Sequence, residues 1–594
     1  MTRRPLRPLA RIIDARGRGE NPDAIERENI RARHEAMRET SRARAEGRLL
    51  VLGLMFFLGF CIVGIRMGSL ASAEVTEPRA TATTASILSG RADIVDRKGR
   101  ILATNIATHS LYAQPPRMID RERAARELAK IFPDLDEERL VKDFTGKRKF
   151  VWVRRTLSPE QMQDVHDIGE PGLQFGPREL RLYPNGRLAS HVLGGATFGR
   201  EGVHSAEVIG EAGVERSFDD ILRNPAGGGA PLELSIDLSV QAAVEQVLSG
   251  GMRLLNARAA AAVLMDVQTG EILSMASYPD FDPNKRPSSK VVEDPADNPL
   301  FNRAVQGVYE LGSTFKPFTA AQAIEAGRVA PGTMIDTKGP LVWGRHRIRD
   351  YRNYGPELSV TDVIVKSSNI GTARMAVDIG GPAQQIFLKR LGLLEPTEVE
   401  LVEAGSGRPL MPRRWSEIST MTISYGHGLS TSPLHLAAGY ATLVNGGTQI
   451  KPTLLKQEGI QLGERIVSVR TSQAIRTMLR ETVKRGTATM ADVEGYAVGG
   501  KTGTADKPDR KNGGYHDDKV IANFASVFPS DDPRYVLVVM LDEPVETSGL
   551  EPRRTGGWTA VPISAEITRR VAPLLGLRPD IEPGSGIEVS LNNN

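Results

Sequence analysis

The apolar positions of this chain form one long block near the N-terminus and many short blocks after it. Leu49 to Ile65 is an uncharged run of seventeen residues that continues to Ala71, with Arg48 before it and Arg66 near its end. Seventeen residues lie at the lower edge of what a membrane-spanning helix needs, and an arginine can extend its charged end toward the interface. The pattern predicts a transmembrane anchor over residues 49–71, with a buried core helix as the alternative.

The charge of the chain is concentrated before this block. Residues 1–48 hold thirteen Arg and eight Asp or Glu, a balance of +5, and the remaining 546 residues carry 63 − 64 = −1. Arginine-rich flanks stay on the cytoplasmic side of a membrane, so we expect a cytoplasmic tail and a body outside the cytosol. Residues 71–73 are similar to a signal-peptidase site, but the preceding tail is too long for a signal peptide, which favours an uncleaved anchor.

Short apolar blocks in the second half of the chain predict a sheet. Two of them flank a turn at residues 268–270 and form a hairpin, and three more lie far downstream. A long, mainly helical stretch separates the two groups, and an amphipathic helix follows the last strand. We therefore predict an α+β fold, in which a five-stranded antiparallel sheet has helices on both faces and a helical insert. The expected strands are 259–267, 271–277, 496–504, 521–528 and 535–541, and the closing helix is 559–575.

The region between the anchor and this sheet mixes short strands and short helices. Ser158 followed by Pro159 is typical of a helix start. Residues 74–90 indicate a linker or an extended strand, residues 225–231 a loop, residues 232–237 a strand and residues 239–255 a helix. The predicted organisation is a cytoplasmic tail, an anchor, a mixed pedestal domain, a catalytic domain and a C-terminal tail, with boundaries 1–48, 49–71, 72–235, 236–577 and 578–594.

Candidate chemistry begins with Ser313 and Lys316, which precede a helical pattern. Residues three apart on a helix share a face, so the hydroxyl and the amine can meet. A serine becomes a nucleophile when a base takes its proton, and lysine is a base only when neutral. Lowering a lysine pKa from about 10.4 toward 7 costs about 4–5 kcal/mol and needs burial or a second cation.

Two further motifs follow in order along the chain. Ser367-Ser368-Asn369 lies 54 residues after Ser313, in a polar break between helical stretches, and Lys501-Thr502-Gly503-Thr504 lies 134 residues after Ser367, on an expected strand. Each motif alone is common, and the ordered triplet is specific. The single cysteine, Cys61, excludes a disulfide scaffold and thiolate metal sites.

A competing pattern overlaps the last motif. Residues 495–502 satisfy G-x-x-x-x-G-K-[ST], which binds nucleotide phosphates when a helix begins directly after Lys-Thr. Here Gly503 and then Pro508 follow, so no helix is expected, and an ATPase is a remote alternative. The nine histidines show no H-E-x-x-H spacing, which leaves a zinc hydrolase unsupported.

The triplet, on a sheet divided by a helical insert, resembles the class B, monofunctional penicillin-binding proteins, and their division-specific members above all. Further segments along the chain are also similar to motifs of that class. Ala92 stands in place of a usual Gly, and Leu311 stands in place of a usual Pro. These similar segments are Gly90–Arg97, Arg181–Gly186, Glu211–Glu215, Leu234–Asp237, Tyr309–Gly312 and Tyr425–Gly428.

The resemblance implies a peptidoglycan D,D-transpeptidase that β-lactams inhibit, with no cofactor and no metal. Ser313 is then the nucleophile, Lys316 its base and Ser367 a proton relay toward Lys501. Asn369 would hold the donor peptide and orient Lys316. The N–H groups of Ser313 and Thr504 would form the oxyanion hole. The Thr502 and Thr504 hydroxyls would bind the carboxylate of the substrate. Gly503 would let the strand approach the substrate closely.

The resemblance also implies a place in the cell. The substrates are peptidoglycan stem peptides, and the expected partners are division proteins such as the glycosyltransferase FtsW at the inner membrane, without nucleic acid. Lateral-wall synthesis by the same chemistry is the main alternative to septal synthesis. A β-lactamase-like hydrolase and a non-catalytic division scaffold are more remote.

Overall fold

A computed structural model describes most of the chain, namely residues 7–72, 90–201, 206–224, 229–288, 292, 294, 297–461, 463–509 and 513–580. The chain forms two compact units. The first comprises residues 1–79, 113–151 and 168–173, and the second comprises the remainder. The predicted linker lies outside the described residues except for Gly90, as do residues 225–228 of the predicted loop and residues 581–594 of the predicted tail.

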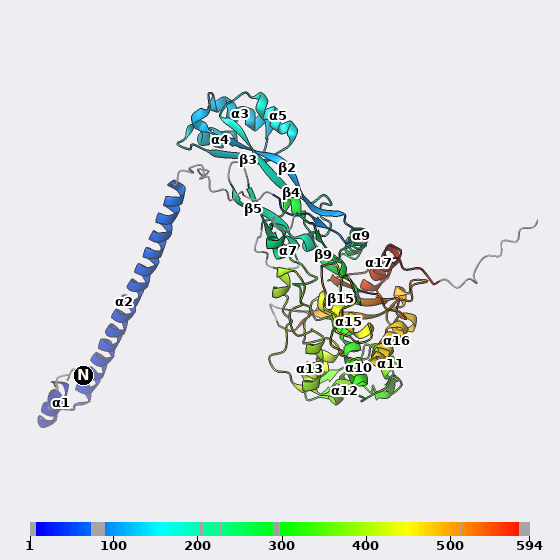
Figure 1. Cartoon of the computed structure of the whole chain (residues 1–594). Helices are drawn as coiled ribbons and strands as arrows, with labels where there is room; N and C mark the ends of the chain where they lie inside the picture. Colours follow the sequence, from blue (N-terminus) through cyan, green and yellow to red (C-terminus); the bar gives the residue numbers. More distant parts are fainter. Residues whose placement is uncertain are drawn as a thin grey trace, which may run out of the picture. The chain divides into compact units, whose positions relative to one another are not determined.

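The first unit is helical. Its helices are α1 (Arg7–Gly17), α2 (Asp23–Ser72), α3 (Arg121–Ile131) and α4 (Glu137–Thr145). Aspartates cap α3 and α4, because Asp120 and Asp136 each accept a hydrogen bond from the backbone N–H three residues later. Figure 1 shows α2 as one continuous helix that contains the predicted anchor. Among the described residues, no helix has the length and apolar character needed to cross a membrane.

The second unit begins with a mixed α/β region. Its sheet has the order β3-β2-β1-β7, with β4 also paired to β2, and β5 and β6 form a separate hairpin. Helix α5 (Pro159–Asp167) starts as predicted, since Ser158 and Gln161 exchange backbone and side-chain hydrogen bonds. The other elements are β1 (Ile94–Val95), β2 (Ile101–Ala113), β3 (Val151–Leu157), β4 (Leu173–Leu182), β5 (Gly195–Glu201), β6 (Ala206–Ala212), α6 (Ser190–Leu193), α7 (Gly213–Ser217), α8 (Asp219–Leu222) and β7 (Leu232–Glu233).

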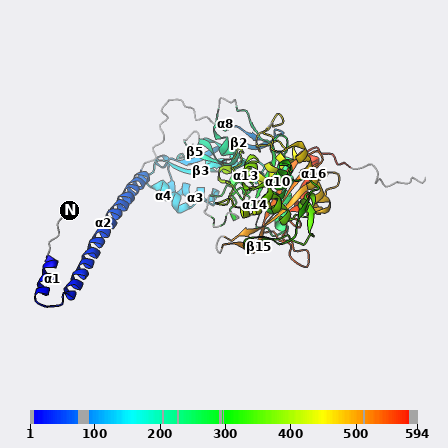
Figure 2. The same cartoon turned by 90° about the horizontal axis from the view of Figure 1, so that it is seen from below.

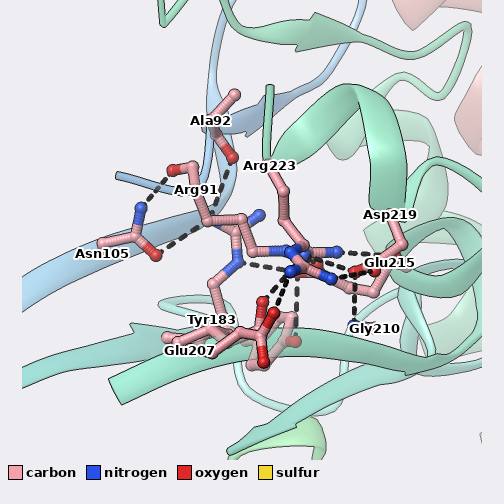
Figure 3. A network of polar contacts seen from close by, with 11 residues as sticks. Arg91, Ala92, Asn105, Tyr183, Glu207, Gly210, Glu215, Asp219 and Arg223 are labelled. Carbon is pink, nitrogen blue, oxygen red and sulfur yellow. Dashed lines mark hydrogen bonds and ion pairs between the residues drawn. The ribbon is translucent and has the colours of Figure 1, made fainter. Parts of the chain in front are cut away.

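A buried ion network holds this region together and joins three of the motifs found in the sequence. Arg91 Nε donates to Glu215 Oε2 at 2.5 Å, and Arg181 Nε donates to Glu215 Oε1 at 2.7 Å. The Tyr183 hydroxyl donates to the same carboxylate, and Asp219 pairs with Arg91 at 2.6 Å (Figure 3). The side chains of Arg91, Arg181 and Glu215 are almost fully buried, so each arginine is desolvated against a carboxylate.

The predicted five-stranded antiparallel sheet is present, with the order β14-β15-β16-β8-β9. Alternate residues point to opposite faces of a strand, and they build two cores. Leu264 of β8 and Val539 of β16 pack with α9 (Leu238–Leu254) and α17 (Ala560–Leu574), whereas Val263 and Val538 face α15 (Pro433–Val444). The strands are β8 (Ala259–Asp266), β9 (Ile272–Tyr278), β14 (Gly499–Pro508), β15 (Tyr515–Phe528) and β16 (Tyr535–Asp542).

The helical insert lies between β9 and β14 in the sequence. Figure 2 shows α10, α13, α14 and α16 grouped in the body that also contains β15. Two small two-stranded antiparallel sheets, β10–β13 and β11–β12, interrupt the helices. The insert comprises η5 (Gly312–Phe315), α10 (Lys316–Glu325), β10 (Met334–Asp336), β11 (Leu341–Trp343), β12 (His346–Ile348), β13 (Glu357–Ser359), α11 (Val360–Val365), α12 (Asn369–Ile379), α13 (Gly381–Arg390), α14 (Glu417–Ser424), α15 and α16 (Val469–Arg485).

Two strand predictions were wrong at their ends. The strand expected over residues 232–237 is only β7, because Asp237 instead caps α9 by accepting hydrogen bonds from Ser239 and Val240 N–H. The strand expected from residue 496 starts at Gly499, because positive φ angles at Gly495 and Ala497 turn the chain there. Strand β14 continues through Lys501 and Thr502, so the helix that a nucleotide-binding loop requires is absent at this position.

Candidate active site

Ser313 lies in the short 3-10 helix η5, immediately before α10. Gly312 has a φ of 59°, and a Cβ there would meet the Thr504 carbonyl oxygen at 2.5 Å. A side chain at Gly312 is therefore excluded both by conformation and by the closeness of β14. The Gly312 N–H donates to the Gly426 carbonyl at 3.1 Å, and the buried Tyr440 hydroxyl donates to the Thr314 carbonyl at 2.8 Å. These contacts fix the backbone that presents the half-buried Ser313.

Ser367 connects the two lysines of the predicted site. The Lys316 amine donates to the Ser367 carbonyl oxygen at 2.5 Å and to Ser367 Oγ at 2.9 Å. The Lys501 amine, which belongs to β14, donates to Ser367 Oγ at 3.0 Å. The structure thus brings residues from η5–α10, the α11–α12 turn and β14 together. Ser313 Oγ makes no hydrogen bond to any described residue, and the predicted contact with Lys316 is absent because that amine is directed to Ser367.

Both lysines are fully buried, and burial favours their neutral forms. Burial and the positive charge of Lys501 hold the pKa of Lys316 well below its usual value, with Asp350 opposing that shift. Burial lowers the pKa of Lys501 to about 7. A neutral amine is a proton acceptor, and a lysine can be shifted this way where a guanidinium cannot. The site therefore provides the burial and the second cation that a lysine base needs.

The turn that carries Ser367 has a strained backbone and is held by hydrogen bonds to Asp350. Ser367 has a φ of 65°, a conformation that is uncommon for a residue other than glycine. Asp350 supports this turn: its carboxylate accepts the Ser368 hydroxyl at 2.6 Å and the N–H groups of Asn369 and Ile370 at 2.6 and 3.0 Å. A carboxylate at these N–H groups is also favoured by the dipole of α12. Strain that is held in this way is typical of functional sites.

Asn369 adjoins the lysines but does not contact them. Its carboxamide nitrogen donates to the Arg349 carbonyl at 2.9 Å. No described hydrogen bond joins Asn369 to Lys316, so its expected role in orienting that amine stays a prediction. Asn369 is partly exposed at the first position of α12, next to the Ser367 turn.

The hydroxyls of β14 have partners across the strand. Thr502 Oγ1 lies 2.7 Å from Thr487 Oγ1, and Thr504 Oγ1 accepts the Gly556 N–H at 3.0 Å. Thr502 and Thr504 share one face of the strand because they are two residues apart. Lys501 precedes Thr502 and directs its amine to Ser367 instead.

Gly503 meets a steric requirement within the fold, besides the close approach to substrate that is expected of it. A Cβ at Gly503 would lie 2.2 Å from the Leu311 carbonyl oxygen and 2.5 Å from Asn523 Oδ1. The Asn523 side chain itself donates to the Leu311 carbonyl at 3.0 Å. The glycine therefore lets β14 pack against the residues that precede Ser313, which brings the two catalytic segments together.

Two residues of the site were missed from the sequence. Asp350 has a weak signal, because it is the single acidic residue among five cationic ones in residues 338–352. Thr487 has none: it follows α16 in an ordinary Gly-Thr-Ala segment, and only the fold places it against Thr502. As a whole, the arrangement offers a hydroxyl nucleophile, a buried amine of lowered pKa, a hydroxyl between two amines and an outward-facing strand edge.

This geometry is that of a serine acyl-transfer site, and comparison with known proteins identifies the class. Residues 260–569 match the family described as the penicillin-binding protein transpeptidase domain, and residues 86–229 match the penicillin-binding protein dimerisation domain. The matched segments include every residue of the triplet and the buried ion network. The chain belongs to the penicillin-binding protein transpeptidase family.

Relatives cover nearly the whole chain. The probable peptidoglycan D,D-transpeptidase FtsI of Caulobacter vibrioides is 36% identical, over 92% of this chain and 91% of its own length. The peptidoglycan D,D-transpeptidase FtsI of Escherichia coli is 29% identical, over 83% and 85% respectively. The crystal structure of penicillin-binding protein 3 from Mycobacterium tuberculosis, complexed with aztreonam, has a TM-score of 0.62 and 25% identity and covers 83% of this chain and 97% of its own.

Proposed function

We propose that the chain cross-links peptidoglycan through an acyl-enzyme on Ser313. The chain is a peptidoglycan D,D-transpeptidase of the FtsI and penicillin-binding protein 3 division type, a serine enzyme that acts in cell-wall synthesis and cell division. The observation that carries the residue assignment is Ser367, whose hydroxyl is bound by both buried lysines while Ser313 lies beside them without a hydrogen-bond partner among the described residues.

The first half-reaction transfers the donor peptide to the enzyme. Neutral Lys316 takes the Ser313 proton as Oγ forms a bond to the penultimate D-Ala carbonyl carbon. The N–H groups of Ser313 and Thr504 stabilise the oxyanion. The tetrahedral intermediate collapses as the bond to terminal D-Ala breaks, and that nitrogen receives a proton through Ser367. Lysines on both sides of the Ser367 hydroxyl make it suitable as a relay.

The second half-reaction releases Ser313. An amine of a neighbouring stem peptide attacks the acyl carbon, loses its proton to the lysine pair and forms the new peptide bond as Ser313 regains its proton. Thr502 and Thr504 hydroxyls, with Lys501, bind the carboxylate of the donor, and Asn369 holds its amide side chain. A β-lactam reacts with Ser313 in place of the donor peptide. Its leaving group stays attached to the acyl-enzyme, so the acyl-serine persists.

The place of the enzyme in the cell is also a proposal. We assign residues 1–48 to the cytoplasm, residues 49–71 to attachment at the inner membrane and the chain after residue 71 to the periplasm. The support is the Arg-rich tail and the exposed large apolar side chains of α2 from Leu49 to Met67. Residues 72–235 form the pedestal, residues 236–577 the transpeptidase domain and residues 578–594 a tail. Division proteins such as FtsW are the proposed partners.

Intact-protein mass after incubation with benzylpenicillin tests the assignment. Wild type should gain one adduct that persists for an hour, and Ser313→Ala should gain none while retaining its thermal unfolding transition. Thr314→Ser is a matched control that keeps a hydroxyl next to the nucleophile. An adduct on Ser313→Ala would contradict the assignment, and a transient adduct with drug consumption would instead indicate a β-lactamase.

A further inference from the structure

A strongly basic hairpin lies next to the active site. Residues 338–352, here called the arginine hairpin, contain five cationic residues and one acid, although the chain after residue 48 has a net charge of −1. The hairpin consists of β11, β12 and the segment that follows them. Its exposed cationic side chains are Lys338, Arg345, Arg347, Arg349 and Arg352.

The charge of this hairpin is not neutralised within the described part of the chain. No described carboxylate lies within ion-pair distance of Arg345, Arg347, Arg349 or Arg352. The single acid of the hairpin, Asp350, is engaged by Ser368, Asn369 and Ile370. The hairpin therefore presents four exposed arginines that have no ion-pair partner among the described residues.

The hairpin is fixed to the catalytic turn on one face. Leu341 and Ile348 are paired across the strands and pack in a small cluster with Ile370 of α12 and with Tyr425. Arg349 holds the Asn369 side chain through its carbonyl. A ligand on the hairpin is therefore held at a fixed position close to Ser367 and Asn369.

The other surface of the hairpin is open. Val342 and Arg347 form the neighbouring cross-strand pair, on the face opposite to Leu341 and Ile348. The exposed fraction is 53% at Val342, 40% at Trp343 and 82% at Tyr351. Exposed arginines among aromatic side chains are the residue types that protein interfaces favour.

We propose that the arginine hairpin binds the carboxylates of an acidic peptide, namely the acceptor stem peptide of the second half-reaction. This inference rests on the proposed function, because it assigns a subsite to the peptide whose amine attacks the acyl-enzyme. The guanidinium fork matches a carboxylate with two parallel hydrogen bonds, and stem peptides carry free carboxylates along their length. The favourable charge would also speed the encounter of the acceptor with the site.

The position of the hairpin favours an acceptor over other anionic ligands. Its Arg349 carbonyl and Asp350 carboxylate are hydrogen-bonded to Asn369 and Ser368, so the hairpin adjoins the turn that carries Ser367. An anionic lipid surface would satisfy the same arginines, and the test below separates the two ligands.

The experiment measures binding of an acceptor to the acyl-enzyme. Full-length protein is acylated with benzylpenicillin, and a stem tripeptide with free carboxylates is titrated by ligand-observed NMR. The same tripeptide with amidated carboxylates is the second probe. The double variant Arg345→Ala/Arg347→Ala should bind the free tripeptide at least tenfold more weakly and change by less than twofold toward the amidated one. Arg345→Lys/Arg347→Lys should recover most of the binding to the free tripeptide.

Arg253→Ala provides the matched control, because Arg253 is exposed on α9, which packs on β8 and β9 at the far edge of the sheet from β14. Equal loss for both probes, or no loss for either, would overturn the inference. So would a double variant that loses binding only to vesicles of anionic phospholipid. Failure of wild type to form the penicillin adduct would instead reject the proposed function, which keeps the two failures distinct.

Discussion

Two pairs of buried cations in the second unit are stabilised in opposite ways. Arg91 and Arg181 share the carboxylate of Glu215, and Arg91 also pairs with Asp219. Lys316 and Lys501 are equally buried, but their contacts are the hydroxyl of Ser367 and backbone carbonyl oxygens. The first pair has counter-charges at hydrogen-bond distance and the second has none.

The difference explains why each residue type is found where it is. A guanidinium remains charged at any physiological pH, so its burial requires a carboxylate, and the result is a fixed joint. An ammonium can lose its proton, so burial without a counter-charge yields a neutral amine that accepts protons. The buried arginines of the pedestal therefore have a structural role, and the buried lysines of the active site have a reactive one.

Lys316→Met should have the largest effect, because it removes the base from the reactive pair. Acylation by benzylpenicillin should slow by about 10²–10⁴-fold, the usual contribution of general base catalysis. The free energy of unfolding should stay the same or rise, because methionine has no charge to desolvate. Rapid-mix mass spectrometry and urea unfolding measure the two quantities. Lys389→Met, on the exposed surface of α13, should leave both unchanged; equal loss in both variants would contradict the assignment.

Glu215→Gln should damage the structural pair instead. The variant leaves Arg181 buried without its counter-charge, and breaking a buried pair from one side costs about 3–5 kcal/mol of unfolding free energy. Glu211→Gln is a matched control, because that side chain is 54% exposed. Urea unfolding of the two variants measures the difference. A Glu215→Gln protein as stable as the control would show that the network does not stabilise the pedestal.

The pH dependence of stability should reveal the unpaired lysine. The pKa of Lys501 is about 7 in the folded protein and 10.5 in the unfolded chain. The unfolded chain therefore binds more protons between these values, and this residue makes stability rise with pH, by up to about 1.4 kcal/mol per unit. The difference in unfolding free energy between wild type and Lys501→Met should follow this trend between pH 7 and 10. A flat difference would contradict the lowered pKa.

Asp350→Asn changes the charge near the reactive pair. The Asp350 carboxylate raises the pKa of Lys316, so its removal should move the acid limb of the acylation pH profile to lower pH. The maximal rate should fall by about tenfold, because charged hydrogen bonds at the Ser367 turn are weakened. Asp336→Asn, on the exposed side of β10, serves as the control. A lower rate with an unmoved pH profile would leave Asp350 a purely structural role.

Thr487→Val should have the smallest effect. It removes the hydroxyl that lies 2.7 Å from Thr502 Oγ1, and one neutral hydrogen bond is worth about 0.5–1.5 kcal/mol. We expect KM for a donor with a free terminal carboxylate to rise by about two- to tenfold, with little change in kcat. Thr487→Ser should restore KM. A change in kcat alone would indicate that Thr487 does not act on substrate binding.

Much of the chemistry was predictable because it depends on short segments. The order and spacing of Ser313, Ser367 and Lys501 identified the class, and short apolar blocks separated by turns predicted the antiparallel sheet. Ser158 and Pro159 marked the start of α5. Each of these signals depends on backbone geometry over a few residues, which the local sequence determines.

Contacts between distant segments were decided only by the tertiary structure. Asp350 and Thr487 lie 18 and 15 residues from their partners Ser368 and Thr502, and no periodicity predicts such contacts. Gly503 was identified, but its neighbour Leu311 lies almost two hundred residues earlier in the chain. The sequence alone indicated which groups are expected to react. The fold decided the burial that lowers the pKa of Lys316, because desolvation depends on everything packed around the amine.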